Sequence, residues 1–312
     1  MKILRDIIEG RNAELAAKYE SGEPIVSCVP TDLTVLNEAY FNERGILTTY
    51  QAHSGEGKSS AARVFLKGAA SAGYRPIFFP FEDPEDKISD AFTSAAMGVS
   101  ASDLRNGKVV NAAKRLSAAT DELWWSENVL VQSEKLPSED IIRLLNSEIQ
   151  YDTGLVVLDY YQAMDAEQDE KSVERVISRL CWKLLDIAKT YNVSVVGFSQ
   201  VKNSVIDRGK QAFDRIVYNY QRQGIELVPE AWMVEAFRPV YGDSQWATGI
   251  YQRSKDLASI FRPGRWLQAM GFHQFKDNYA EWVRCKVNYT EGNKVIKTGW
   301  NGPMSSFTEW KK

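Results

Sequence analysis

The sequence predicts an α/β fold: a mostly parallel β-sheet with helices on both faces, preceded by a short N-terminal helix. Short runs that are apolar at every position alternate with longer segments of helical periodicity. Strands of that composition are buried on both faces, as in a parallel sheet covered by helices. A glycine-rich loop also stands between one such run and a helix, which is a second feature typical of α/β domains.

The expected elements follow in chain order. Runs of Val, Ile, Leu and aromatic residues predict strands at 45–51, 77–81, 154–159 and 193–199, and a hairpin of 281–287 with 294–299. Apolar residues at helical spacing predict helices at 1–20, 58–72, 84–97, 138–149 and 170–190. Turn-forming residues, such as Gly73 and Pro76 after the second helix, separate these elements.

The N-terminal segment stands apart from the rest. Its spacing of apolar residues suits an amphipathic helix, and Ser21 to Pro24 ends that helix. We therefore divide the chain into a linker-type helix, 1–24, and one domain, 25–312. The helix either folds back on its own core or docks on a neighbouring molecule. Within the domain, residues 202–248 form a polar, irregular segment that is longer than an ordinary loop.

Composition excludes several classes of protein. Three scattered cysteines, an odd number, indicate reduced thiols, and only two histidines argue against a histidine metal site. The charged N-terminus does not have the pattern of a signal peptide, and no apolar stretch is long enough to span a membrane. We expect a cytoplasmic protein with no membrane partner.

Charge is unevenly distributed along the chain. Residues 1–201 hold 21 basic and 30 acidic residues, whereas residues 202–300 hold 15 basic and 10 acidic ones. A polyanionic partner would therefore meet the C-terminal third. The alternative is that the asymmetry is chance scatter.

Residues 52–60, from Ala52 to Ser60, form the strongest motif. A Gly-x-Gly-Lys-Ser loop between a strand and a helix lets backbone N–H groups converge on phosphate oxygens. Lys58 would reach the β- and γ-phosphates, and the Ser59 hydroxyl would bind Mg²⁺. The expected nucleotide-binding residues are Ser54, Gly55, Glu56, Gly57, Lys58, Ser59 and Ser60.

Three further polar residues end predicted strands. Asp159 follows an apolar run and would hold Mg²⁺ beside the phosphate loop. Glu82 follows the strand at 77–81 and could activate the attacking water, although the neighbouring acids also fit a solvated helix start. Gln200 ends the strand at 193–199 and would sense the γ-phosphate. The sequence thus predicts a P-loop ATPase that uses ATP or another nucleoside triphosphate with Mg²⁺.

In this order the motifs resemble the ATPase domain of the DnaB-like hexameric replicative helicases, which has a RecA-like core. Thr31 to Asn37 is similar to the segment that leads into the family's first core strand, and its phosphate loop often begins with Ala, as at Ala52. Residues 78–82, 158–162 and 195–200 are similar to its strands that carry the catalytic Glu, the Walker B Asp and the sensor Gln. The resemblance covers about residues 30–300 and is specific up to Gln200.

The resemblance implies roles that spacing alone does not give. It implies Lys58, Glu82 and Gln200 as catalytic groups, and Ser59 and Asp159 as metal ligands. It also implies a homo-hexameric ring whose sites are completed by a neighbour's basic residues, here Arg284 and Lys286. The family usually has Lys-x-Arg there, whereas Asn288 follows in this chain. The alternative is that both are solvent-facing charges on a hairpin.

The resemblance further implies a single-stranded DNA partner, gripped by the basic loop that follows Gln200. Its expected contacts with phosphate are Lys202, Arg208, Lys210 and Arg215. A primase or a helicase loader is a further expected partner, and a compact member from a phage or mobile element is the expected type. The leading hypothesis is an ATP-driven helicase. A filament-forming recombinase on the same core and a non-motor nucleotide switch are the alternatives.

Overall fold

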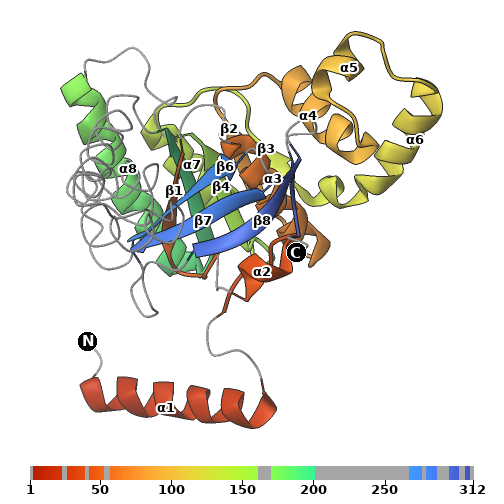
Figure 1. Ribbon diagram of the computed structural model, residues 1–312. Helices are drawn as coiled ribbons and strands as arrows, with labels where there is room; N and C mark the ends of the chain where they lie inside the picture. The colour runs from red at the N-terminus through yellow and green to blue at the C-terminus, as the bar shows by residue number, and fades with distance from the viewer. Residues whose placement is uncertain are drawn as a thin grey trace, which may run out of the picture.

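The fold is seen in a computed structural model, which describes residues 3–22, 27–38, 42–52, 57–160, 170–200, 267–275, 279–286, 295–301 and 306–309 (Figure 1). The described helices are α1 (Leu4–Ser21), α2 (Thr34–Asn37), α3 (Lys58–Ser71), α4 (Glu85–Met97), α5 (Ala101–Arg105), α6 (Ala112–Glu122), the 3₁₀ helix η1 (Trp124–Asn128), α7 (Ser138–Glu148) and α8 (Glu170–Tyr191). The described strands are β1 (Leu47–Ala52), β2 (Ile77–Pro80), β3 (Leu130–Val131), β4 (Leu155–Asp159), β5 (Ser194–Gln200), β6 (Leu267–Phe275), β7 (Tyr279–Lys286), β8 (Val295–Asn301) and β9 (Ser306–Thr308).

All the described strands join one sheet in the order β3-β2-β4-β5-β1-β6-β7-β8-β9. The pairs from β3 to β6 are parallel, and β6 to β9 continue the sheet as antiparallel pairs. The predicted, mostly parallel sheet is therefore confirmed, as is the hairpin, now seen as β7 paired with β8. The sequence did not predict α2, α5, α6, η1, β3, β6 or β9.

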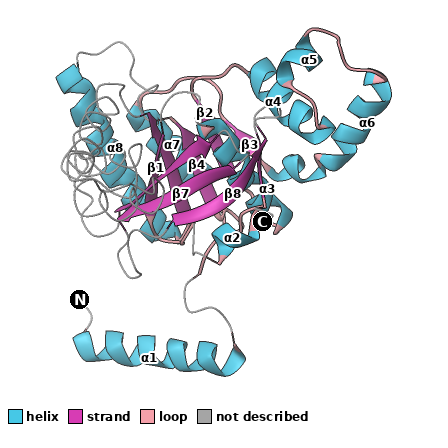
Figure 2. Ribbon diagram, in the orientation of Figure 1, coloured by secondary structure: helices cyan, strands magenta, loops and turns pink. Residues whose placement is uncertain are grey.

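Alternation along the strands divides the core into two layers. On β4, Leu155 and Val157 join a cluster with Phe65 of α3, whereas Val156 and Leu158 join a second cluster with Leu145 of α7 and α8 side chains. Successive side chains of a strand point to opposite faces, so a run that is apolar throughout must be covered twice. Helices lie on both faces of the sheet, α3 on one and α7 with α8 on the other (Figure 2).

Helix α1 is a formed helix that buries none of its residues. It stands apart from the sheet and its covering helices (Figure 1). Ile3, Leu4, Ile7 and Ile8 are each at least half exposed. A helix is thus present as predicted, but its apolar residues are not gathered on one side along its length, so the predicted amphipathic character is wrong. The alternative in which the helix folds back on its own core is not what the structure shows.

Gly68 on α3 is required by a close approach of backbone. A Cβ atom there would lie 2.2 Å from the carbonyl carbon of Thr31 and 2.5 Å from the amide nitrogen of Asp32. Backbone cannot move aside as a flexible side chain can, so Gly68→Ala should destabilise the fold by about 1–3 kcal/mol or more. Denaturant unfolding measures this change.

Gly10 on α1 is the matched control, because a Cβ there meets nothing within 4 Å. Alanine has the higher helix propensity, so Gly10→Ala should be neutral or slightly stabilising. An equal response of the two variants would contradict the packing described for Gly68.

Candidate functional site

The predicted site residues lie at the carboxyl ends of adjacent strands. The strands β2, β4, β5 and β1 are neighbours in this order and run parallel. Asp159 ends β4 and Gln200 ends β5, whereas Glu82 follows β2 and Lys58 follows the loop after β1. The register pairs Pro80 with Asp159 and Ala52 with Gln200, so the strand ends are level. Ligands of open α/β sheets bind at this edge.

Helix α3 begins at Lys58, directly after Gly57. Gly57 has a φ of 90°, a left-handed conformation that glycine adopts without strain. The first amides of a helix have no intrahelical partner, and the helix dipole favours negative charge there, so this end is suited to phosphate. Lys58 is 7% exposed, and its Nζ lies 6.0 Å from the ring centroid of Tyr160.

Asp159 is the most perturbed acid of the site. Burial raises its pKa from 3.8 to about 6, and the charges of Glu82 and Asp83 act in the same direction. A hydrogen bond from the Ser59 hydroxyl and the charge of Lys58 oppose this rise. These side chains therefore influence one another's charge: the buried Asp159 carboxyl group lies near the start of α3, which we call the phosphate helix.

The same carboxyl group tests whether the residues fit Mg²⁺. Its Oδ1 atom is buried and has no hydrogen-bond partner among the described residues, and the Ser59 hydroxyl acts on the same carboxyl group by lowering its pKa. A carboxylate and a hydroxyl, both oxygen donors, are ligands that Mg²⁺ accepts. Among the described residues, no group of three or more acidic, histidine or cysteine side chains could hold a metal. In proteins, Mg²⁺ is usually held by one or two carboxylates together with substrate phosphates and water.

Glu82 lines a small cavity beside these ligands, together with Ser59, Asp159, Asp83 and Arg63. The volume of this cavity is about 30 Å³, enough for a water molecule. A hydrogen bond of 2.9 Å from the Phe81 amide to the Asp159 carbonyl extends the pairing of β2 and β4 up to Glu82. A carboxylate held beside a water-sized cavity is placed to orient or deprotonate a water molecule.

The family follows from a comparison of the chain with known proteins. A family model described as the DnaB-like helicase C terminal domain matches residues 28–212, more than half of the chain. The chain belongs to the DnaB-like helicase family. The matched residues include Lys58, Ser59, Glu82 and Asp159, so the described part of the site lies within the family domain.

A curated relative of this DnaB-like chain agrees with that assignment. A curated protein of Trieres chinensis, described as a probable replicative DNA helicase, is 25% identical over 208 residues, which are 62% of this chain and 44% of that protein. The chain thus spans less than half of that relative's length.

Solved structures show the same RecA-like fold. A structure described as an ATPase domain matches with a TM-score of 0.70 and 14% identity, over 97% of this chain and 99% of that chain. A DnaB-like replicative helicase, studied with its interactions with primase, matches with a TM-score of 0.67 and 15% identity, over 97% and 67%. RadB recombinase matches with a TM-score of 0.50 and 12% identity, over 91% and 100%.

Several predicted site residues of this DnaB-like chain lie outside the described residues. These are Ser54, Gly55, Glu56, Lys202, Arg208, Lys210 and Arg215. Gln200, Arg284 and Lys286 are described through their backbone alone, the first ending β5 and the other two on β7. Ser60 is buried on α3, one residue beyond Ser59.

The sequence did not single out Arg63, which lines the cavity beside Glu82. It is a charged residue within the otherwise apolar run Ala61 to Leu66 of α3. A cation that interrupts the apolar part of a helix must be compensated by specific contacts, so this interruption was the available signal.

The raised pKa of Asp159 predicts how stability of this DnaB-like chain depends on pH. An acid whose pKa is higher in the folded than in the unfolded state lowers stability as pH rises from about 4 to about 6, and the loss persists above that window. Without metal and nucleotide, Asp159→Asn should therefore unfold at a higher denaturant concentration than the wild type at pH 8. Its free energy of unfolding should be higher by on the order of 2 kcal/mol. The difference should shrink at pH 4, and equal differences at both pH values would contradict the burial argument.

Proposed function

We propose that the chain is an ATP-dependent DNA helicase motor that hydrolyses ATP, or another nucleoside triphosphate, with Mg²⁺. The observation that carries the proposal is the convergence of Lys58, Ser59, Glu82 and Asp159 at one edge of the sheet. Generic phosphate binding needs only the loop and helix, whereas hydrolysis also needs a metal ligand and a carboxylate beside the attacking water.

In this proposal each side chain has a separate task. Lys58 places positive charge on the β- and γ-phosphates at the start of α3, and Glu82 orients the water molecule. Asp159 and Ser59 would hold Mg²⁺, which when bound neutralises the phosphate charge that develops during hydrolysis. Gln200, at the end of β5, would sense the γ-phosphate and pass its presence to the segment that follows.

The rest of the motor cycle is proposed from family membership. Lys202, Arg208, Lys210 and Arg215 would follow the phosphates of single-stranded DNA, with an affinity that falls as salt rises. A homo-hexameric ring would place Arg284 and Lys286 of one subunit near the site of the next. The exposed apolar side chains at the start of α1 support assembly, because burying them against another subunit would add stability. Primase or a loader is a proposed partner.

The test of the motor is the response of nucleotide hydrolysis to DNA. Purified protein is expected to hydrolyse ATP slowly alone and at least about tenfold faster with single-stranded DNA, because a translocating motor couples turnover to its track. The stimulation should weaken steeply between low and moderate salt. A rate that is the same with and without DNA would remove the helicase and leave the nucleotide switch.

A recombinase-type filament is the second candidate, because the RadB recombinase shares the fold. Both candidates have a nucleotide site at the same sheet edge, so hydrolysis does not separate them. Negative-stain microscopy with nucleotide and single-stranded DNA does. Closed six-fold rings support the helicase, and extended filaments support the recombinase.

A further inference from the structure

Glu82 is held between two structural elements. On its N-terminal side, β2 is fixed to β4 through the amide of Phe81. On its C-terminal side, α4 begins at Glu85 after Pro84. The placement of Glu82 relative to the phosphate helix therefore depends on how firmly α4 is joined to α3, as well as on the sheet.

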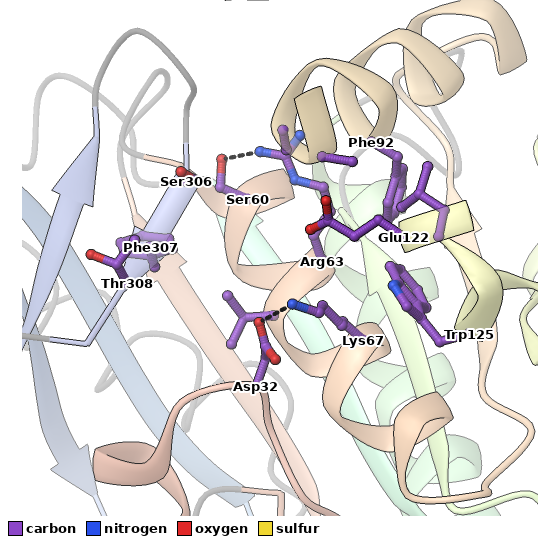
Figure 3. A pocket seen from close by; sticks show the side chains of 14 residues that line it. Asp32, Ser60, Arg63, Lys67, Phe92, Glu122, Trp125, Ser306, Phe307 and Thr308 are labelled. Carbon is purple, nitrogen blue, oxygen red and sulfur yellow. Dashed lines mark hydrogen bonds and ion pairs between the residues drawn. The ribbon is translucent and has the colours of Figure 1, made fainter. Parts of the chain in front are cut away.

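Arg63 is the directional link between these two helices. From the second turn of α3 its Nη1 donates a hydrogen bond of 2.7 Å to the carbonyl of Ala91 on α4, and its Nη2 donates one of 3.0 Å to the Ser60 hydroxyl. Its guanidinium also lies 5.9 Å from the ring centroid of Phe92 on α4. Figure 3 shows Arg63 and Ser60 on α3 joined by the hydrogen bond, with Phe92 on the other side of Arg63.

Apart from a hydrogen bond from the Ser133 hydroxyl to the Glu85 carboxylate at the first turn of α4, the other described contacts of α4 with the core are apolar. Ile88 and Phe92 pack against the cluster that contains Phe65. Apolar contacts are non-directional and allow neighbouring elements to shift, whereas a planar guanidinium with two bonds fixes both distance and orientation. Arg63 thus adds a geometric constraint that the apolar contacts do not supply.

Arg63 also lines two separate cavities. It lines the small cavity of Ser59, Glu82 and Asp159, and it lines a larger pocket of about 270 Å³ between α3, α4, η1 and β9. Burial lowers the pKa of Arg63 to about 10, so the side chain is still charged at neutral pH. A partly buried cation is costly unless it is paired or hydrogen-bonded, so its position beside the cavity at Glu82 argues for a role that a packed apolar side chain could not fill.

We propose that Arg63 is a positioning residue, which holds α4, and with it Glu82, in register with the phosphate helix α3. The proposal rests on the hydrolytic function proposed above. Arg63 is not assigned a contact with the nucleotide. Its effect reaches the reaction through the distance between the Glu82 carboxylate and the phosphate bound at Lys58 and Ser59.

The test is a comparison of Arg63→Met with the wild type. Methionine fills much of the space but cannot donate to Ala91 or Ser60. The expected result is a kcat for basal ATP hydrolysis that is lower by about ten- to a hundredfold, since small misplacements of a reacting group have effects of that size. The KM and the affinity for a non-hydrolysable ATP analogue should change less than about threefold, because the phosphate-binding groups are unchanged. Arg63→Lys should restore part of the rate.

Arg115→Met is the matched control. Arg115, on α6, also donates a hydrogen bond to a carbonyl of α4, that of Met97, but at the far end of the helix from Glu82. Its loss should lower the melting temperature and leave kcat per folded molecule unchanged. The two arginine-to-methionine variants therefore separate a local stability effect from a positioning effect.

The outcomes are distinct. A wild-type kcat for Arg63→Met, or an equal loss of kcat in both variants, would overturn the positioning role. A raised KM with an unchanged kcat would make Arg63 a nucleotide contact and also overturn it. A wild type that binds but does not hydrolyse nucleotide would overturn the proposed function and this inference together, and only that result would affect both.

Discussion

Lys58→Ala is expected to abolish nucleotide hydrolysis, lowering kcat by at least about a hundredfold. Lys58 is buried at the first position of α3, and its charge acts on the Asp159 carboxylate. In the proposed mechanism its positive charge would meet developing phosphate charge in a place shielded from water. The loss of hydrolysis should appear with and without DNA, because phosphate binding by Lys58 is needed before DNA can stimulate the reaction. Phosphate release under saturating ATP measures it.

Lys67→Ala is the control on the same helix. Lys67 lies farther along α3, and its Nζ pairs with Asp32 at 2.9 Å on the surface. A partly exposed ion pair contributes at most about 1 kcal/mol, so this variant should keep its activity with a small change in stability. A Lys58→Ala protein as active as Lys67→Ala would refute the phosphate site.

Glu82→Gln is expected to separate binding from hydrolysis. The amide keeps the shape of the side chain but cannot accept a proton, so kcat should fall by about 10²- to 10⁴-fold while nucleotide affinity is retained. Although a carboxylate near Asp159 is removed, Mg²⁺-dependent nucleotide binding should be altered only slightly, because the proposed ligands Ser59 and Asp159 are unchanged. Equilibrium binding of a fluorescent ATP analogue and single-turnover hydrolysis give the two values.

Glu85→Gln tests the alternative in which Glu82 and the acidic residues after it only form the solvated start of a helix. Glu85 is in the first turn of α4 and accepts a hydrogen bond from Ser133. If these acids serve only to begin a solvated helix, both variants should hydrolyse nucleotide at similar, nearly normal rates. The geometry instead predicts a large loss for Glu82→Gln alone.

The sequence predicted the central strands and their helices because the pattern of apolar residues in each segment matches the burial that the segment has in the fold. The run from Leu155 to Leu158 is apolar at each position, as a strand buried on both faces must be. Helix α6 was missed because its segment, from Ala112 to Glu122, has Leu116 as its one large apolar residue, so no run of large apolar side chains marks a buried face. Strand β6 was missed because Gln268, Gly271 and His273 interrupt its apolar pattern.

The site was predictable where a residue's role depends on its position at a strand end or in a loop. Asp159 and Glu82 each follow a recognisable strand, and parallel strands bring their carboxyl ends together. The role of Arg63 depends instead on the packing of α3 against α4: a cation within an apolar run indicates that it makes specific contacts, but the sequence does not show that these are with α4. None of the described helices combines the length and apolar character of a membrane span.

The exposed apolar side chains of α1 have a consequence for how an assembled state would respond to temperature and dilution. Their burial could contribute only between molecules, since the helix buries nothing against its own subunit. Hydrophobic association weakens on cooling, and any association weakens on dilution. Rings held in part by this helix would therefore be cold-labile, so that protein stored cold and dilute would regain its quaternary structure only after warming at higher concentration.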